Sequence, residues 1–588
     1  MGEKSDLNAN LCCHATGDPQ VDTAVYQWMT WDRNPQTRAQ IESLVKAGHV
    51  EELRRRLCSR MSFGTAGLRA AMGAGFARIN DLTIIQSTQG MYKYLAKFFP
   101  DLGSRGLVVG YDTRAQETCG CSSERLARLT AAVMLCKDVP VYLFSTYVPT
   151  PFVVYWNNGA QISSPHDKEI LRCIEESVEP WPDSWNEKLP DSSALRSDPL
   201  QEICHLYMEE LSSLCFHREL NSKTSLKFVH SSFHGVGHRY VQQAFKVFGF
   251  PQPIPVPEQK DPDPNFSTVS CPNPEEGESV LELSLQLAEK EGARVVVATD
   301  PDADRLAVAE QCKWKVFTGN ELAALLGWWM LYNWKETHPE VTEFKKVYML
   351  ATTVSSKILQ TIARTEGFHF EETLPGFKWI GNKICDLTKM GHEVIFSFEE
   401  SIGFLCGSMV PDKDGVSAAV VVAEMAAYLE NKNLTLNQQL KNIYETYGYH
   451  ISKTSYVICN DPPTVKRIFS RLRNFGGENL YPILCGGYNI VQVRDATTGY
   501  DNNQPDQKSV LPVTKSSQMV TFTLQNGIVA TLRTSGTEPK IKYYTEFCAP
   551  PGERSVSRLL EEELKRVTAA LVEEFLEPDK NNLIPRSV

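Results

Sequence analysis

Short apolar runs alternate with helix-like amphipathic stretches along most of this chain. The clearest apolar runs lie at residues 106–111, 139–144, 226–230, 293–298, 346–351 and 393–398. Runs of this kind, separated by helical patterns, are typical of parallel strands in α/β layers. We therefore expect three α/β domains in succession, over residues 1–199, 200–318 and 319–434.

The pattern changes after Leu434. Strand-like segments that are mostly antiparallel in style follow, and a helix is expected over residues 558–575. The expected strands are residues 451–459, 488–494, 519–524 and 527–533. This predicts a smaller C-terminal α+β domain over residues 435–588. The length of 588 residues also favours about four domains, because single cores stop growing well below this size.

Several other segments carry simple expectations. The first 60 residues are charged and helical, with an amphipathic stretch over residues 40–56. The most apolar stretch, residues 322–334, is shorter than the ~20 residues that a membrane span needs, so it is expected to be a buried helix. Helices are also expected over residues 200–215 and 416–431, whereas the polar, proline-rich residues 179–199 are expected to form a surface connection.

Composition narrows the class of protein. Hydrophobic residues make up 42% and charged residues 22%, as in ordinary globular proteins. The net charge of −11 argues against nucleic acid or an anionic membrane as the main partner. The 16 cysteines are scattered, without zinc-type spacing, and are expected to be reduced thiols in a cytosolic protein. The N-terminal residues show no signal-peptide pattern.

A cluster of acidic residues follows the apolar run 293–298. Asp300, Asp302 and Asp304 recur at every second position, so an extended loop would point all three carboxylates to one side. Carboxylates held this close repel one another unless a cation lies between them. Hard oxygen ligands suit Mg²⁺, and open α/β sheets bind ligands at the C-terminal ends of their strands. The alternative is an acidic surface turn.

A second motif, RTSGTEPK at residues 533–540, follows the strand-like run 527–533. Ser535, Gly536 and Thr537 offer hydroxyls and closely approaching N–H groups, and Arg533 offers a guanidinium fork for a dianion. Lys542 adds positive charge nearby. We expect a phosphate-binding loop here, with an ordinary glycine turn as the alternative.

Three further motifs are weaker. In FEESIG, Glu399 and Ser401 alternate, so both could face a sugar, which needs an acceptor and an adaptable donor; a solvated acidic turn is the alternative. FGTAGLR is a glycine-rich turn that ends at Arg69. LPGFKW places Lys378 on a loop.

Together these motifs resemble the α-D-phosphohexomutase superfamily. Each of its four domains contributes one loop to a central cleft: a phosphoserine loop, a three-aspartate metal loop, a sugar loop and a phosphate loop. Three of the four are present in family order. The resemblance covers nearly the whole chain, through FGTAGLR, HGVGH, CPNPEEGESVL, TTVSSKIL and LIPRSV. It is strongest to the phosphoglucomutase-2 branch and, within it, to the group of glucose-1,6-bisphosphate synthases.

The resemblance implies a fold of three mixed-sheet α/β domains plus a C-terminal α+β domain. It also implies phosphoryl transfer from 1,3-bisphosphoglycerate to hexose monophosphates through a phosphoserine, with Mg²⁺. The expected ligands are glucose 1-phosphate, glucose 6-phosphate and glucose 1,6-bisphosphate, and the expected state is a cytosolic monomer without nucleic-acid or membrane partners. The alternatives are phosphoglucomutase or phosphopentomutase activity, or a non-catalytic sugar-phosphate-binding variant.

The resemblance assigns roles to residues of this chain. Asp300, Asp302 and Asp304 would hold Mg²⁺, and Arg305 would lie beside the phosphoserine. Glu399 and Ser401 would bind sugar hydroxyls. The remaining residues would hold or approach phosphate: Arg533, Ser535, Gly536, Thr537, Lys542, Arg69 and Lys378.

The chain departs from the family at one place. Residues Thr150 to Val153 run directly into Val154, where the family has a helix, a strand and the serine loop. Roughly thirty residues are absent, about the size of a βα crossover with its strand. No position matches the phosphocarrier serine, so the first domain is expected to be incomplete and this form inactive.

Another serine could in principle substitute. Ser164, His166 and Asp167 bring together a hydroxyl, an imidazole and a carboxylate. A helix start accounts for the same residues, with Ser164 as N-cap, Pro165 at the first helical position and Asp167 three residues on. We favour the helix start.

Overall fold

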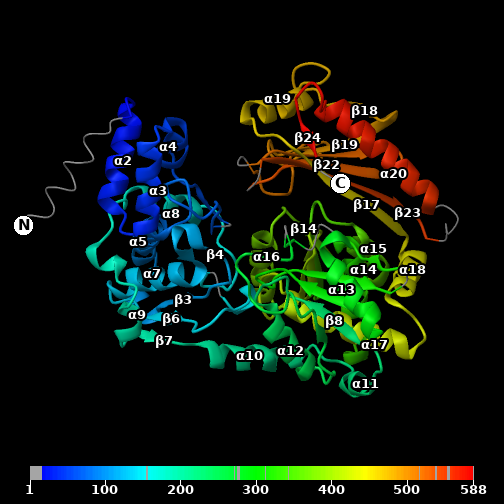
Figure 1. Ribbon diagram of the computed structural model, residues 1–588. Helices are drawn as coiled ribbons and strands as arrows, with labels where there is room; N and C mark the ends of the chain where they lie inside the picture. Colours follow the sequence, from blue (N-terminus) through cyan, green and yellow to red (C-terminus); the bar gives the residue numbers. More distant parts are fainter. Residues whose placement is uncertain are drawn as a thin grey trace, which may run out of the picture. The chain divides into compact units, whose positions relative to one another are not determined.

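The computed structural model describes residues 16–586 except 66, 154–155, 270–271, 274–277, 312, 342, 515–516, 537–538 and 552–556. The chain divides into two compact units (Figure 1). Unit 1 comprises Met1–Val316 and Met409–Glu424, and unit 2 comprises Phe317–Ser408 and Met425–Val588. The boundaries of the four domains expected from the sequence stay a prediction.

Unit 1 alternates helices and short strands. Its helices are α2 (Pro19–Trp31), α3 (Pro35–Lys46), α4 (Val50–Leu57), α5 (Asp81–Phe98), α6 (Leu102–Arg105), α7 (Ser123–Leu135), α8 (His166–Glu175), α9 (Leu189–Ser192), α10 (Leu200–Ser212), α11 (Arg218–Lys223), α12 (Gly237–Val247) and α13 (Glu278–Glu291). Its strands are β1 (Phe63–Gly64), β2 (Gly67–Leu68), β3 (Leu107–Val109), β4 (Ala115–Gln116), β5 (Cys121–Ser122), β6 (Val141–Leu143), β7 (Arg196–Ser197), β8 (Phe228–Ser231), β9 (Ile254–Pro255), β10 (Val295–Thr299), β11 (Leu306–Glu310) and β12 (Lys315–Val316).

The main sheet of unit 1 has the order β12-β11-β10-β8-β9. Strand β10 pairs in parallel with β8, as Val295 opposite Phe228 shows, and antiparallel with β11. All five residues of β10 are buried. This explains the continuous apolar run in the sequence, because a strand covered on both faces needs no polar side. The expected buried parallel strand is confirmed.

The structure adds detail to two expectations for unit 1. The surface connection expected over residues 179–199 contains helix α9 and strand β7, and β7 pairs in parallel with β6 in the three-stranded sheet β3-β6-β7. A strand of one Arg and one Ser leaves no apolar run to detect. The amphipathic stretch 40–56 belongs to two helices, α3 and α4, since the chain turns at Gly48, where φ is +67°.

Unit 2 contains several helices. These are α14 (Gly319–Thr337), α15 (Ile358–Glu366), α16 (Phe377–Lys389), α17 (Gly415–Asn431), α18 (Leu436–Tyr447), α19 (Pro462–Arg473) and α20 (Ser557–Leu571); the division between the units falls within α17. The strands are β13 (Val347–Thr352), β14 (His369–Thr373), β15 (Glu393–Glu399), β16 (Gly403–Cys406), β17 (Tyr449–Ile458), β18 (Leu484–Cys485), β19 (Tyr488–Asp495), β20 (Tyr500–Asp501), β21 (Met519–Leu524), β22 (Ile528–Thr534), β23 (Lys540–Ala549) and β24 (Ile584–Pro585).

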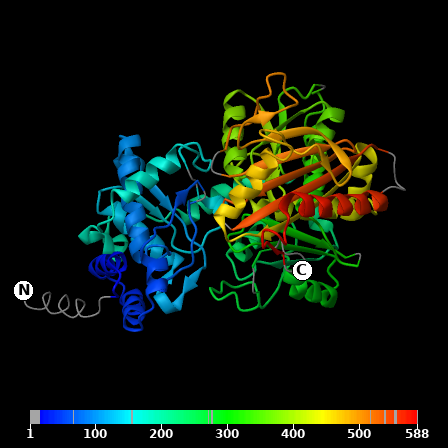
Figure 2. The ribbon, with the colours of Figure 1, turned by 90° about the horizontal axis from the view of Figure 1, so that it is seen from above.

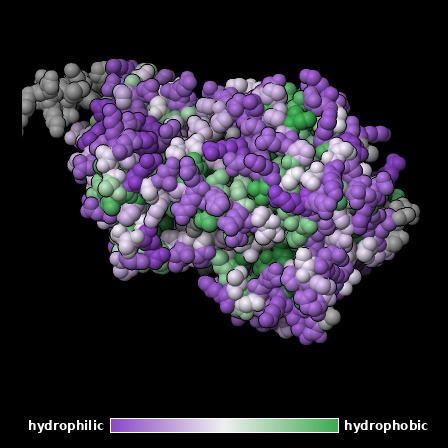
Figure 3. Space-filling model, turned by 90° about the horizontal axis from the view of Figure 1, so that it is seen from below, coloured by the Kyte–Doolittle hydropathy of each residue, from purple (hydrophilic) through white to green (hydrophobic). Residues whose placement is uncertain are grey.

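Helix α14 confirms the buried helix expected over residues 322–334. Thr318 and Glu321 form a capping box at its start, and most of its residues are buried. Within the described residues, none of the helices combines the length and apolar character that crossing a membrane would require. The face drawn in Figure 3 is mostly hydrophilic, with apolar residues in small separate patches.

Unit 2 has two sheets. The first has the order β14-β13-β15-β16, in which β13 pairs in parallel with both neighbours and β16 is antiparallel. The second, in the order β18-β19-β21-β22-β23-β17-β24, is antiparallel throughout. Helices α19 and α20 cover one face of this second sheet (Figures 1 and 2) and bury apolar residues such as Leu532, Ile541 and Val567. The expected C-terminal α+β domain is confirmed as a β-rich domain.

Candidate functional site

The three aspartates converge at the C-terminal end of β10. One carboxylate oxygen of each of Asp300, Asp302 and Asp304 lies within 4.8 Å of the other two. The loop is a turn rather than the extended segment expected from the sequence, since Ala303 has φ +56°. The backbone reversal at Ala303 brings the carboxylates together, so the predicted cluster is found although the predicted loop geometry is wrong.

Charged side chains of both signs lie in and around this cluster. Burial raises the pKa of the Asp300 carboxyl well above its ordinary value, and Asp302 and Asp304 raise it further. Arg305 opposes this: its backbone N–H donates to Asp300 at 3.0 Å, and its guanidinium lies 3.7 Å from Asp304. The Nζ atom of the buried Lys413 lies 2.8 Å from Asp304. Arg114 also interacts electrostatically with all three aspartates, which raise the pKa of its guanidinium. The oxygen donor set of the three carboxylates fits Mg²⁺.

Sequence reasoning did not single out Lys413. It stands between Asp412 and Asp414 just before α17, more than a hundred residues after the aspartates. The sequence DKDG just before an apolar helix could have indicated a buried lysine, because buried lysines need acidic partners.

The chain before the junction after Val153 contacts the aspartate cluster, and the chain after it contacts Asp412, the neighbour of Lys413. The Thr150 hydroxyl donates to Asp302 at 2.9 Å, and the Thr150 N–H donates to the Asp302 carbonyl at 2.9 Å. On the far side, the Gln161 side chain donates to Asp412 at 2.8 Å. Residues 154–155 lie outside the described part of the chain. A segment inserted after Val153 would therefore start next to the aspartates.

Ser164 lies at the start of α8 but does not cap it. The helix begins at His166, one residue later than expected, and Pro165 occupies the N-cap position without a side-chain bond. The Ser164 hydroxyl donates instead to Asp167 at 2.8 Å. The His166 ring is hydrogen-bonded to the Tyr94 hydroxyl at 2.6 Å and packs on Trp156. His166 therefore belongs to an aromatic cluster and not to a catalytic pair with Ser164.

Arg69 follows the small hairpin of β1 and β2. Gly64 pairs with Gly67 in this hairpin, and the Arg69 side chain is exposed. Its expected role near phosphate stays a prediction.

The sugar motif forms a hairpin between β15 and β16 in unit 2. Glu399 is the last residue of β15 and pairs with Gly403, so residues 400–402 make the connection. Ile402 has φ +54°, as in hairpins that end in a left-handed residue. Glu400 points inward, where its backbone N–H donates to the Ser355 hydroxyl at 3.0 Å. Glu399 and Ser401 flank this residue, and because Ser401 lies within the turn, their expected common orientation toward a sugar stays a prediction.

The phosphate motif forms the hairpin between β22 and β23. Arg533 pairs with Lys542 across the two strands, and the Ser535 N–H donates to the Lys540 carbonyl at 2.9 Å. A side chain added at Gly536 would meet no atom within 4 Å. Thr537 lies outside the described residues. Two cations in directly opposed positions repel each other, and in the described part of the chain neither forms an ion pair with a carboxylate.

The register places further residues on the same face as these cations. Side chains alternate between sheet faces, so Lys542, Tyr544 and Glu546 of β23 share one face, and Arg533 and Thr531 of β22 share it with them. Leu532 and Ile541 belong to the other face, under α19 and α20. We call the face with Arg533 and Lys542 the phosphate face.

Lys378 lies in the first turn of helix α16 and not on a loop. The loop expectation is wrong because Gly376, with φ +110°, turns the chain directly into the helix. Its proposed approach to phosphate stays a prediction.

Comparison with known proteins identifies the family. Models of the phosphoglucomutase/phosphomannomutase α/β/α domains I, II and III match residues 60–155, 205–313 and 318–447, more than half of the chain. The chain belongs to the phosphoglucomutase/phosphomannomutase family. The domain I match of this family ends at residue 155, beside the junction described above.

Curated relatives within the family are similar over the full chain. The chain is 67% identical to the glucose 1,6-bisphosphate synthase of Homo sapiens, over 100% of this chain and 99% of the relative. It is 54% identical to the phosphopentomutase of Homo sapiens, over 97% and 98%. The resemblance to glucose-1,6-bisphosphate synthases is confirmed. The alignment with the first relative spans 619 positions against 588 residues in this chain, so at least 31 positions have no counterpart here.

Solved structures of the family support the fold. The chain matches a phosphoglucomutase, parafusin from Paramecium, with a TM-score of 0.61 and 16% identity, over 88% of this chain and 96% of the other. It matches a phosphomannomutase of Thermus thermophilus, described as putative, with a TM-score of 0.60 and 18% identity, over 88% and 99%. The phosphohexomutase fold expected from the sequence is confirmed.

Proposed function

We propose that this chain is a sugar-phosphate-binding member of the glucose-1,6-bisphosphate synthase group that lacks phosphoryl transfer. The observation that carries the proposal is the junction after Val153. Roughly thirty residues are missing there by sequence, at least 31 positions of the 67% identical relative have no counterpart, and the domain I match stops at residue 155. In the intact enzyme, transfer would run from 1,3-bisphosphoglycerate to a hexose monophosphate.

The ligands are proposed to be glucose 1-phosphate, glucose 6-phosphate and glucose 1,6-bisphosphate. Arg533, Ser535, Gly536, Thr537 and Lys542 would hold the phosphate that is not transferred. Glu399 and Ser401 would bind the sugar hydroxyls, and Arg69 and Lys378 would approach phosphate. The opposed cations at Arg533 and Lys542 support this, because an anion between them removes their repulsion.

Asp300, Asp302 and Asp304 would hold Mg²⁺, which would neutralise negative charge on a phosphoryl group. Arg305 would lie beside that group and orient it. The serine that carries the phosphoryl group in the family has no counterpart, and its absence removes both a metal ligand and the nucleophile. The chain is proposed to be a cytosolic monomer.

A second candidate is phosphoglucomutase or phosphopentomutase activity, which the 54% identical phosphopentomutase favours. The two candidates differ in the donor. In a version with the missing segment restored, product formed from glucose 1-phosphate should depend on added 1,3-bisphosphoglycerate. Equal turnover without that donor would favour a mutase.

Ligand binding tests the recognition part of the proposal in the chain as it is. Titration calorimetry should detect weak binding of glucose 1-phosphate, and Lys542→Met should lower its affinity about tenfold, as expected when one charge-assisted bond is lost. Lys453→Met is the matched control, since Lys453 lies on neighbouring β17 but on the opposite sheet face. An equal loss of affinity for glucose 1-phosphate in both variants, or no binding by the parent, would overturn the proposal.

A further inference from the structure

The loop between β13 and α15 contacts the sugar hairpin through Ser355. The buried Ser355 hydroxyl accepts the Glu400 N–H at 3.0 Å and lies 3.3 Å from the Glu400 carboxylate. It also lies 2.6 Å from the Thr352 hydroxyl. Both the backbone and the side chain of Glu400 are thus fixed by one residue. Because Glu400 stands between Glu399 and Ser401, its orientation sets theirs.

The next two residues of the same loop contact β23. The Ser356 hydroxyl donates to Glu546, and the Lys357 N–H donates to the Glu546 carboxylate at 3.0 Å. This carboxylate lies at the start of α15, where a negative charge is favourable. Glu546 is on the phosphate face, four residues along β23 from Lys542, which is about 13 Å of strand. The loop therefore holds the strand that carries the proposed phosphate site.

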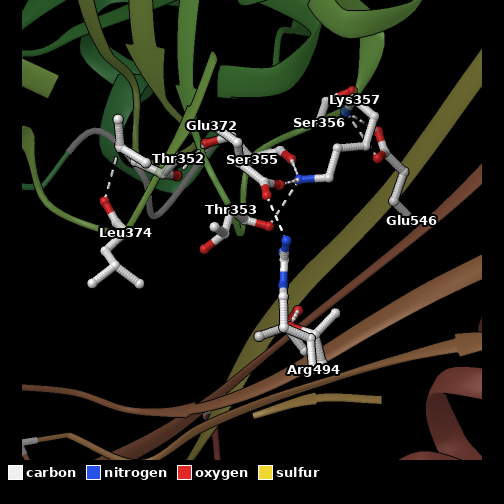
Figure 4. Close-up of polar contacts among 12 residues, drawn as sticks. Thr352, Thr353, Ser355, Ser356, Lys357, Glu372, Leu374, Arg494 and Glu546 are labelled. Carbon is white, nitrogen blue, oxygen red and sulfur yellow. Dashed lines mark hydrogen bonds and ion pairs between the residues drawn. The ribbon is translucent and has the colours of Figure 1, made fainter. Parts of the chain in front are cut away.

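A half-buried ion-pair cluster completes the contact. The Lys357 ammonium lies 2.7 Å from Glu372, whose other oxygen lies 2.7 Å from the Arg494 guanidinium of β19 (Figure 4). Burial alone would raise the pKa of Glu372, but Lys357 and Arg494 lower it to about 2. Glu372 stays ionised at neutral pH. It links the loop to a second strand of the sheet that carries the phosphate face.

From these contacts we infer that residues 355–357 are a positioning element. They fix the separation between the sugar hairpin at Glu399–Ser401 and the phosphate site at Arg533 and Lys542, and Ser355 is the positioning residue on the sugar side. A fixed separation selects ligands in which phosphate and sugar hydroxyls stand at the matching distance. The inference rests on the proposed function, and it assigns ligand-size selectivity to residues that would not touch the ligand.

If Ser355 had a purely structural role, its replacement would lower the stability of the protein without changing the affinity for one ligand relative to another. The two roles are therefore separated by comparing a ligand that uses both sites with one that uses the phosphate site alone. Glucose 1-phosphate uses both, and inorganic phosphate uses one. Ribose 1-phosphate, with a smaller ring, tests the selectivity directly.

The experiment is titration calorimetry of the full chain with these three ligands. Ser355→Ala should lower the affinity for glucose 1-phosphate about tenfold, as for a lost bond to a charged group. It should leave inorganic phosphate unchanged and reduce the preference for glucose 1-phosphate over ribose 1-phosphate. Glu400→Gln, made from the hairpin side, should act in the same direction. The double variant should lose little more than either single one, since both act through one contact.

Thr353→Val is the matched control. Thr353 lies in the same loop, and its buried hydroxyl has no hydrogen-bond partner among the described residues, so its removal should leave all three affinities unchanged. Suppose that the parent binds glucose 1-phosphate and that Ser355→Ala does not alter the ratio of its affinities for glucose 1-phosphate and inorganic phosphate. The inference is then wrong while the proposed function stands. If the parent binds no sugar phosphate, the proposed function fails and the inference fails with it.

Discussion

At the scale of single residues, the aspartate cluster brings three carboxylates together among cationic side chains. Asp300, Asp302 and Asp304 face Arg305 and Lys413. Lys413 binds Asp304 directly, so it competes with a metal ion for one carboxylate. The cluster can keep its shape without metal because these cations already reduce the repulsion among the three carboxylates.

Mg²⁺ should therefore bind weakly to this chain in the absence of sugar phosphate. If the phosphoserine oxygen expected as the fourth ligand is absent, as proposed above, waters would have to complete the shell. Titration calorimetry should show weak binding that strengthens when glucose 1,6-bisphosphate is added. Tight binding to the protein alone would contradict this expectation.

Glu372 should make the stability of the protein sensitive to acid. Its pKa of about 2 lies below the ordinary value of 4.5, so the ionised carboxylate stabilises the folded state. This stabilisation is fully present above about pH 4.5 and is lost as the pH falls from there through about 2. Its upper limit is about 3 kcal/mol for a shift of this size. Glu372→Gln should destabilise the protein at pH 7, and urea unfolding should show the difference from the parent shrinking below pH 4.5. A constant difference down to pH 3 would argue against this ion pair.

At the scale of elements, the hairpin of β22 and β23 holds two cations, Arg533 and Lys542, in directly opposed positions. Lys542→Met should raise the free energy of unfolding by about 0.5 kcal/mol, since like charges in directly opposed positions are destabilising. The same change should weaken phosphate binding. Urea unfolding of the ligand-free protein is the measurement, and a loss of stability would show that Lys542 is a packing residue and not a ligand-binding one.

The sheet β3-β6-β7 should be the weak element of the chain. Its outer strand β7 has two residues, and we expect the family's serine-loop strand to be absent from it. Losing a few hundred Å² of apolar burial at about 25 cal/mol per Å² amounts to several kcal/mol. Limited proteolysis should therefore cut faster before residue 200 than after it. Equal rates on both sides would mean that β7 and the surrounding helices restore the lost cover.

The sequence predicted those elements whose environment is uniform along the strand. Strand β10 is buried at every position. The charged aspartates that follow it mark the end of the strand in the sequence. Strand β7 is too short and polar to give a pattern, and the expected strands did not include β23, whose lysines and glutamate interrupt its apolar residues. Lys413, Ser355 and Glu372 act through contacts between segments distant in sequence, which no local pattern contains.

At the scale of the whole molecule, the chain has the domains of the phosphoglucomutase/phosphomannomutase family, and we propose that it lacks the serine that carries the phosphoryl group. A carrier serine divides one difficult transfer into two easier ones. The loops proposed to bind phosphate and sugar would still recognise a ligand, but recognition without differential stabilisation of the transition state does not accelerate the reaction. The account therefore predicts binding without transfer.

The most direct test is incubation with 1,3-bisphosphoglycerate labelled in the transferable phosphate, followed by measurement of protein-bound label. The chain is compared with a version in which the missing segment is restored between Val153 and Val154, and with Ser164→Ala and Thr150→Val. We predict label only in the restored version, and no glucose 1,6-bisphosphate above background from the chain as it is. Stable label on the unrestored chain would contradict the account, and its loss in either variant would identify the hydroxyl that replaces the missing serine.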